Sequence, residues 1–316
     1  MIRYGILSTS SIAPRFIAAV RESGTGEIVA VSSRTIEKAR EKASEWNISS
    51  AYGSHGELLE DENVEAVYIS AVNSQHYRWA KEALLHGKHV ICEKPCTIRE
   101  EDTRELFAIA KERGLFLMEA QKMLFLPAIL EAKKRIASGA LGSIRVAEFT
   151  HSFDGSYNAW MYDEAAGGGP LLSSAIYVIE LLQFLFECRV ADIGGYCTKH
   201  PGTNVEEQYV LTGRMENGVL FSLKNSTVAL MKNGAALYGE QGWAELPDYW
   251  KARQVTFRLR SGEEETLRFP CEHELIYEAN HIADCMERGL LESPVVTGEF
   301  SAAAIAVLEK VKALWK

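Results

Sequence analysis

An apolar strand runs directly into a charged pair and a proline in the stretch VICEKP, residues 90–95. In doubly wound α/β sheets, ligands collect at the carboxyl ends of the strands, so Lys94 is predicted to reach whatever binds in that crevice. Pro95 fixes φ and removes a hydrogen-bond donor, which constrains the direction of the lysine. So short a motif more commonly marks a solvated lysine at a turn, and only its surroundings favour chemistry.

Those surroundings alternate short β-branched runs with amphipathic stretches as far as Met118. The predicted strands are Arg3–Leu7, Ile28–Ser32, Ala66–Ser70, His89–Cys92 and Phe116–Met118, and the predicted helices include Ile36–Trp46, Ser74–His86 and Glu100–Arg113. Strand and helix in this order imply a mostly parallel sheet covered on both faces. The α/β pattern therefore predicts an N-terminal Rossmann domain, a doubly wound parallel sheet over residues 1–120.

The pattern changes after a helix at about 127–138, where longer strands of alternating character begin. The predicted strands are Arg145–Phe153, Asp192–Thr198, Glu207–Met215, Leu220–Ser226, Ala235–Tyr238 and Thr256–Leu259, with turn signals at 216–218 and 261–263. Helices at about 171–186, 275–288 and 302–314 are expected to cover one face. This predicts a C-terminal α+β domain, residues 121–316, with a large, mainly antiparallel open sheet that binds substrate. Because the other face must be exposed or meet a partner, we expect a homodimer or homotetramer through this sheet.

Composition excludes several classes of partner. The 316 residues are 47% hydrophobic and 24% charged, with a net charge of −9, which argues against nucleic acid and against an anionic membrane. No apolar run approaches the roughly 20 residues of a membrane helix, and no signal peptide is recognisable, so a cytoplasmic protein is expected. The six cysteines lack C-x-x-C or zinc-finger spacing, which favours reduced thiols and no metal.

The loop after the first strand departs from the usual dinucleotide pattern. If G-x-G-x-x-G/A falls on Ser8, Ser10 and Ala13, serines replace both leading glycines. Each serine adds a Cβ where backbone should approach the pyrophosphate, but hydroxyls and backbone N–H groups can still donate to an anion. The predicted cofactor contacts in this loop are Ser8, Thr9, Ser10, Ser11 and Ile12. Taken alone, the loop would fit a simple helix N-cap.

The end of the second strand indicates which nucleotide is bound. It reads Ser32-Ser33-Arg34-Thr35, with no acidic residue for a ribose 2′-hydroxyl. Arg34, next to Ser33, can form two hydrogen bonds to a phosphate or stack on adenine. NADP is therefore favoured over NAD, although Arg34 would also fit a solvated residue at the helix entrance.

With these residues the chain resembles the Gfo/Idh/MocA oxidoreductase family over almost its whole length. Further matching segments are residues 73–76, 87–95, 139–144, 167–172 and 281–285. Within the family, the dimeric dihydrodiol dehydrogenases and sugar dehydrogenases are most similar, because CEKP is followed by Cys96-Thr97 and the glycine triplet leads to Tyr177.

The resemblance implies roles for individual residues. It places Lys94 beside the nicotinamide and the reacting carbon, and Tyr177 where that branch has its acid/base tyrosine, although Tyr177 would also fit a helix core. Ser173 stands where aspartate is common, so the usual lysine-aspartate-histidine arrangement is absent. The cofactor contacts implied in this half are Asn73, His76, Glu93, Lys94 and Glu119; helix capping by Asn73 or Ser74 is an equal alternative.

A polar and aromatic segment would suit a sugar or cyclic diol through stacking and hydrogen bonding. It includes His151, Asp154, Tyr157, Trp160 and Tyr162, and loop packing explains it almost as well. The predicted substrate contacts are Lys122, Asp154, Trp160, Ser173 and Tyr177.

The predicted function is an NADP(H)-dependent oxidoreductase that moves hydride to or from a secondary alcohol of a sugar, inositol or cyclic diol, with Lys94 and Tyr177 as catalytic residues and NAD as a second possible cofactor. One alternative is a non-catalytic dinucleotide- or metabolite-binding regulator, which Ser173 and the serine loop favour. The other is a redox-assisted glycosidase on the same fold.

Overall fold

The computed structural model describes residues 1–155 and 159–315. The chain divides into two compact units, which are described separately: Met1–Gln121 with His273–Ala302, and Lys122–Glu272 with Ala303–Lys316. Within the described ranges, no helix is long and apolar enough to cross a membrane. No group of three or more metal-ligating side chains occurs in those ranges either. The six cysteines are free.

The first unit contains a six-stranded sheet in the order β3-β2-β1-β4-β5-β6. Its strands are β1 (Ile2–Leu7), β2 (Gly26–Ser32), β3 (Ser50–Tyr52), β4 (Ala66–Ile69), β5 (His89–Glu93) and β6 (Leu117–Ala120). All neighbouring pairs are parallel. This is the doubly wound Rossmann order, with its switch point between β1 and β4, so the predicted fold of this half is confirmed.

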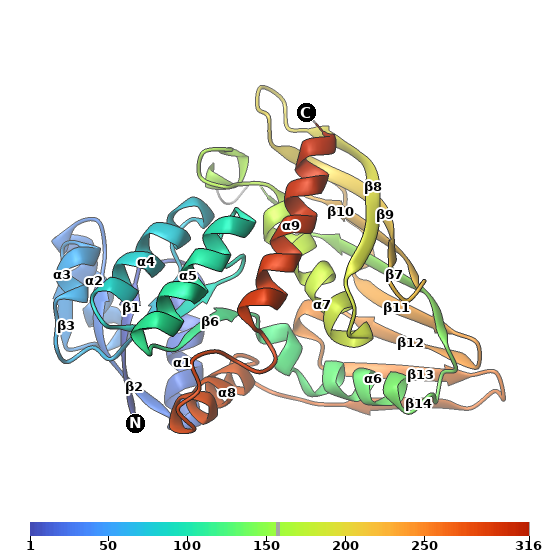
Figure 1. The fold of residues 1–316 in the computed structure, drawn as a ribbon, viewed down its shortest axis with the longest axis horizontal. Coiled ribbons are helices and arrows are strands. Elements are labelled where there is room, and N and C mark those ends of the chain that lie inside the picture. The colour runs from blue at the N-terminus through green and yellow to red at the C-terminus, as the bar shows by residue number, and fades with distance from the viewer. Residues whose placement is uncertain (156–158, 316) are drawn as a thin grey trace. The chain divides into compact units, whose positions relative to one another are not determined.

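The helices of this unit pack on the sheet or on one another, and α4 and α5 lie side by side (Figure 1). They are α1 (Ala13–Ser23), α2 (Ile36–Trp46), α3 (His55–Leu59), α4 (His76–Leu85), α5 (Glu100–Arg113) and α8 (Ile276–Glu287). The short elements β3 and α3 were not predicted. The expectation that the helix at 275–288 covers the second sheet was wrong, because α8 belongs to the first unit and packs against α1.

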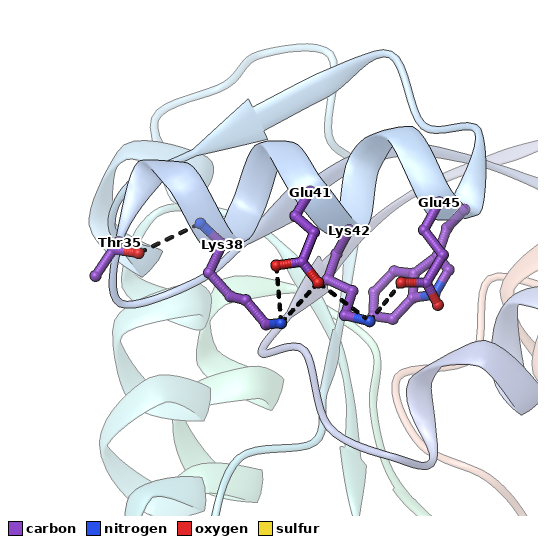
Figure 2. A network of polar contacts seen from close by, with 6 residues as sticks. Thr35, Lys38, Glu41, Lys42 and Glu45 are labelled. Atoms are coloured by element: carbon purple, nitrogen blue, oxygen red, sulfur yellow. Dashed lines mark hydrogen bonds and ion pairs between the residues drawn. The ribbon is translucent and has the colours of Figure 1, made fainter.

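The helix α2 begins immediately after the predicted nucleotide-reading turn. The Thr35 hydroxyl accepts a hydrogen bond from the Lys38 backbone N–H at 3.3 Å, which fixes the start of the helix. Figure 2 shows Lys38 paired with Glu41, 2.8 Å apart, and Lys42 paired with Glu45. Such exposed pairs stabilise a helix only slightly, but they leave the two lysines with nearby counter-charges.

The second unit contains an eight-stranded sheet in the order β14-β13-β12-β11-β7-β10-β9-β8. Its strands are β7 (Ile144–Ser152), β8 (Val190–Lys199), β9 (Glu206–Met215), β10 (Leu220–Ser226), β11 (Gly234–Gly239), β12 (Gly242–Pro247), β13 (Gln254–Leu259) and β14 (Glu264–Arg268). The pair β7 and β10 is parallel, whereas the other pairs are antiparallel. The mainly antiparallel sheet is confirmed, although β12 and β14 were not predicted.

The two faces of this sheet differ in their exposure to solvent. In β9, Tyr209 and Leu211 are buried, whereas Val210 between them is 51% exposed. The helices α6 (Pro127–Ala137) and α7 (Ile176–Phe186) contact the sheet and each other (Figure 1). The last helix, α9 (Gly298–Leu314), starts in the first unit and continues in the second. As expected, helices cover one face and leave the other exposed.

Candidate active site

The loop after β1 keeps a glycine conformation without a glycine. Ser8 has φ of 97°, in the left-handed region that L side chains rarely adopt. A non-glycine residue held there costs of order 1–3 kcal/mol. The backbone therefore follows the course that the dinucleotide pattern requires at its first glycine, although the residue itself departs from the pattern.

The second serine of the loop is tied to the sheet. The Ser10 hydroxyl donates to the Ser70 hydroxyl at 2.7 Å, and Ser70 directly follows β4. Beyond the loop, α1 starts with Ile12 as its N-cap, so no side-chain hydrogen bond caps this end of the helix. The N–H groups of Ala13 and Arg15 already donate to the Ser10 and Ile12 carbonyls, at 3.3 and 3.0 Å, and Pro14 has none. What this end of the helix offers a pyrophosphate at the switch point is therefore the positive end of its dipole. Thr9 is half-buried and Ser11 is exposed in the same loop.

The turn after β2 holds the predicted nucleotide-reading residues. The Ser33 N–H donates to the Tyr52 carbonyl at 3.2 Å, and Ser33 is 8% exposed. The Ser32 hydroxyl lies 2.8 Å from His55 Nδ1, where the donor depends on the tautomer. Arg34 is exposed at the exit of the strand. His55 was missed by the sequence analysis because it belongs to α3, which was not predicted.

The Glu93-Lys94-Pro95 loop is held on one side by a buried histidine. His76 is 1% exposed, and its ring nitrogens lie 2.8 Å from the Pro95 carbonyl and 2.9 Å from the Ala71 carbonyl. Burial lowers the pKa of this imidazole, and the two carbonyls partly oppose that effect. The contacts join the loop after β4 to the loop after β5. His76 therefore positions the segment that carries Lys94; its predicted cofactor contact stays a prediction.

On the other side, Glu119 of β6 accepts a hydrogen bond from the Cys96 N–H, at 2.8 Å. Glu119 is fully buried. The neighbouring Cys92 thiol and burial raise the pKa of Cys96 well above its usual value, so this thiol stays neutral. Glu93 accepts a hydrogen bond from the Tyr68 hydroxyl.

Lys94 itself is half-buried, and the Lys94-Pro95 peptide bond is cis. The structure thus brings Glu93, Lys94, His76 and Glu119 together at the carboxyl ends of β4, β5 and β6. Asn73 opens the short helix η1 (Asn73–Gln75) there, and neither η1 nor α4 has a side-chain cap. The capping alternative for Asn73 and Ser74 is therefore not what the structure shows.

In the second unit, Ser173 and Tyr177 lie on successive turns of one helical segment. A π-helix, η4 (Leu171–Ala175), precedes α7, and π-helical turns are frequent at functional sites. The Ser173 hydroxyl donates to the Gly169 carbonyl at 2.9 Å. Tyr177 is 9% exposed.

Glu206 anchors the start of this segment, and the sequence analysis missed it. One of its carboxylate oxygens accepts from the Leu171 N–H at 2.7 Å. Burial raises the pKa of Glu206. Gly169 has φ of 104°, and a side chain there would meet the same carboxylate. The glycine triplet therefore allows Glu206 to reach the helix that carries Tyr177.

The remaining predicted substrate residues are spread over short elements. Lys122 is 8% exposed in η2 (Lys122–Phe125), which contacts α7. Asp154 is exposed, and Trp160 is half-buried in η3 (Ala159–Tyr162). Tyr157 lies outside the described residues. The roles of Lys122, Asp154 and Trp160 in binding substrate stay predictions.

Aromatic stacking involves two other residues of that segment. His151 stacks on Trp250 of η5 (Tyr249–Lys251), with ring centroids 4.0 Å apart, and Tyr162 stacks on His200 at 3.9 Å. Trp250 was not predicted, because it lies far away in the sequence.

Comparison with known proteins agrees with this architecture. Residues 2–121 match the model of the oxidoreductase family with an NAD-binding Rossmann fold, and residues 129–245 match the GFO/IDH/MocA C-terminal domain. The trans-1,2-dihydrobenzene-1,2-diol dehydrogenases of Mus musculus and Bos taurus are 31% and 32% identical to the chain, each over 98% of it and 96% of the relative.

Two solved structures show the same fold. Levoglucosan dehydrogenase, complexed with NADH and levoglucosan, has a TM-score of 0.90 at 18% identity, over 99% of this chain and 96% of that one. A 3-ketoreductase from Actinomadura kijaniata, complexed with NADP and TDP-benzene, has a TM-score of 0.88 at 24% identity, over 99% and 97%. From the family models and the full-length relatives, the chain belongs to the Gfo/Idh/MocA family of NAD-binding oxidoreductases.

Proposed function

We propose that the protein transfers hydride between NADP(H) and a secondary alcohol of a sugar, inositol or cyclic diol. The observation that carries this proposal is the Lys94 loop at the carboxyl end of β5, held by His76 from one side and by Glu119 from the other. A catalytic group needs such support, because its position must be set before substrate binds. The names of the relatives, diol and sugar dehydrogenases, support the substrate class.

The bound dinucleotide would supply or accept the hydride. The ammonium of Lys94 would stabilise the negative charge that develops on the alcohol oxygen as its proton moves. Tyr177 would give or take that proton. The loop Ser8–Ile12 and the N-terminus of α1 would hold the pyrophosphate, while Asn73 and Glu93 would line the nicotinamide half.

NADP is proposed over NAD because of the turn after β2. Arg34 stands there, and no acidic residue of that turn could accept a hydrogen bond from a ribose 2′-hydroxyl. A guanidinium favours a phosphate, and charge-assisted hydrogen bonds to it are about twice as strong as neutral ones.

The first expected result is selective binding of NADPH. Titration with NADPH and with NADH, followed by quenching of protein fluorescence and by transfer to the nicotinamide, should give the smaller Kd for NADPH. Saturable NADPH binding without turnover on a broad polyol panel would favour the regulatory alternative, to which Ser173 in place of aspartate also points. Binding of neither dinucleotide would contradict the proposal. Release of free monosaccharide without net change in NADP would favour the glycosidase.

We also propose that the exposed face of the second sheet joins copies of the chain. The strand registers align Leu220, Val146, Tyr238 and Trp243 in one row across four neighbouring strands. Leu220 is 52% exposed, Tyr238 38% and Trp243 37%. A continuous apolar row of this kind favours a protein partner, and a second copy presents the same row.

Light scattering at micromolar concentration is therefore expected to give the mass of a dimer or tetramer. Substitution Trp243→Glu should shift that mass toward the monomer, because it replaces an apolar ring of the proposed interface with a charged side chain, which is unfavourable to bury. A monomeric wild-type protein, or an unchanged mass in the variant, would contradict the proposed interface.

A further inference from the structure

A chain of contacts in the first unit links the end of β2 to an arginine on α4. From Ser32, the hydroxyl contacts His55, whose ring meets that of Trp79 edge to face, with centroids 4.8 Å apart. The guanidinium of Arg78 lies over the Trp79 ring, 4.7 Å from its centroid. Arg34 follows Ser32 by two residues. Two arginines that are far apart in the sequence therefore belong to one cluster.

The positive charges of this cluster lack a counter-charge. Within residues 1–155 and 159–315, neither Arg34 nor Arg78 forms an ion pair with a carboxylate. Lys38 on α2 behaves differently, because Glu41 neutralises it (Figure 2). Lys81 on α4, three residues beyond Arg78, pairs with Glu105 at 2.6 Å. The cluster therefore carries net positive charge, whereas the neighbouring cations Lys38 and Lys81 are each paired with a glutamate.

The histidine at its centre carries no charge at neutral pH. Burial, first, and then the charges of Arg34 and Arg78 lower the pKa of His55 to about 4. Both guanidiniums are thus close enough to act on the same imidazole, from the turn after β2 and from α4. Two uncompensated cations around a neutral ring repel each other, and a multivalent anion between them would remove that cost.

We propose that Arg78 is a second specificity-determining residue of the cofactor site, which joins Arg34 in holding the phosphate monoester on the adenosine ribose of NADP(H). This inference rests on the proposed function, since it assigns a partner to the same dinucleotide. A guanidinium offers a planar fork that matches phosphate oxygens. The contact with Trp79 holds that fork in place, which reduces the entropy lost on binding. His55, held by Ser32, would lie beside the bound phosphate without adding charge.

The test compares Arg78→Gln with Lys81→Gln in the full-length protein. Because R78Q would lose a charge-assisted hydrogen bond to the phosphate, we expect it to weaken NADPH binding about 10- to 100-fold and to leave NADH binding within about threefold. K81Q removes a cation from the same helix, but one that Glu105 already pairs, so both affinities should stay near wild type. Equal loss for NADPH and NADH in R78Q, or no loss, would overturn the inference.

A second measurement does not depend on R78Q being folded. In the wild-type protein, 2′,5′-ADP should raise the pKa of the His55 imidazole, followed by NMR, because its 2′-phosphate supplies the missing negative charge; 5′-AMP should not. No difference between the two nucleotides would overturn the inference. Failure of the proposed function would look different, since the wild-type protein would then bind neither NADPH nor NADH.

Discussion

Replacing Lys94 by alanine is expected to lower kcat by about 10²- to 10³-fold, the usual cost of removing one group that stabilises transition-state charge, while the Kd of NADPH stays close to wild type. The physical reason is that the ammonium stabilises charge that appears on the substrate oxygen only during the reaction. Steady-state turnover and fluorescence titration on the same preparation would measure the two quantities. Unchanged turnover would remove Lys94 from the mechanism.

A matched control is Lys88→Met, which removes a lysine just before the same strand. The Lys88 ammonium donates to the carbonyls of Asp61 and Val64, at 2.7 and 2.8 Å. Its role is therefore to satisfy buried backbone oxygens, whose loss of a partner costs about 1–3 kcal/mol. K88M should unfold at lower denaturant concentration and keep the kcat of the folded fraction. A similar fall of kcat in K88M and K94A would mean that the loop had merely lost its shape.

The contrast between these two lysines illustrates what the sequence could predict. Lys94 follows the apolar run Val90-Ile91-Cys92 of β5, and a parallel strand buried on both faces has this pattern, so both β5 and the position of the lysine after it were predictable. The elements missed in the first sheet were short: β3 has three residues, all half-buried, and such a segment carries no periodicity.

Other features depend on contacts that no local pattern records. An amphipathic helix shows which of its faces is buried but not which partner buries it, so α8 was assigned to the wrong sheet. Glu206, at the start of a β-strand, caps a helix 35 residues earlier in the chain. Arg78 and His55 could not be singled out from the sequence, because only the packing of α3 and α4 brings them near the end of β2. Residues whose contacts join segments far apart in the chain were missed, whereas the positions of residues at strand ends could be predicted from the sequence.

Ser173 and Tyr177 are the two residues of the second unit to compare as proton-transfer groups. Ser173 stands where the family resemblance implies an aspartate, but a serine hydroxyl is not a carboxylate base at neutral pH. Its hydroxyl already donates to the Gly169 carbonyl. The next residue on the same helical face is Tyr177, four positions later. The phenolic hydroxyl of Tyr177 is therefore the stronger candidate for moving the proton.

Substitution Tyr177→Phe should accordingly lower kcat by about 10²- to 10⁴-fold with a small change in KM, because the variant loses a single hydroxyl and keeps the ring that packs in α7. The pH dependence of kcat/KM should also lose the limb that reports the acid/base group. Tyr4→Phe is the matched control: Tyr4 is fully buried in β1, and its hydroxyl has no hydrogen-bond partner among the described residues. Y4F should keep both kcat and the pH profile. If Y177F turns over within about threefold of wild type, a range too small for a lost acid/base group, the proton must move through another group.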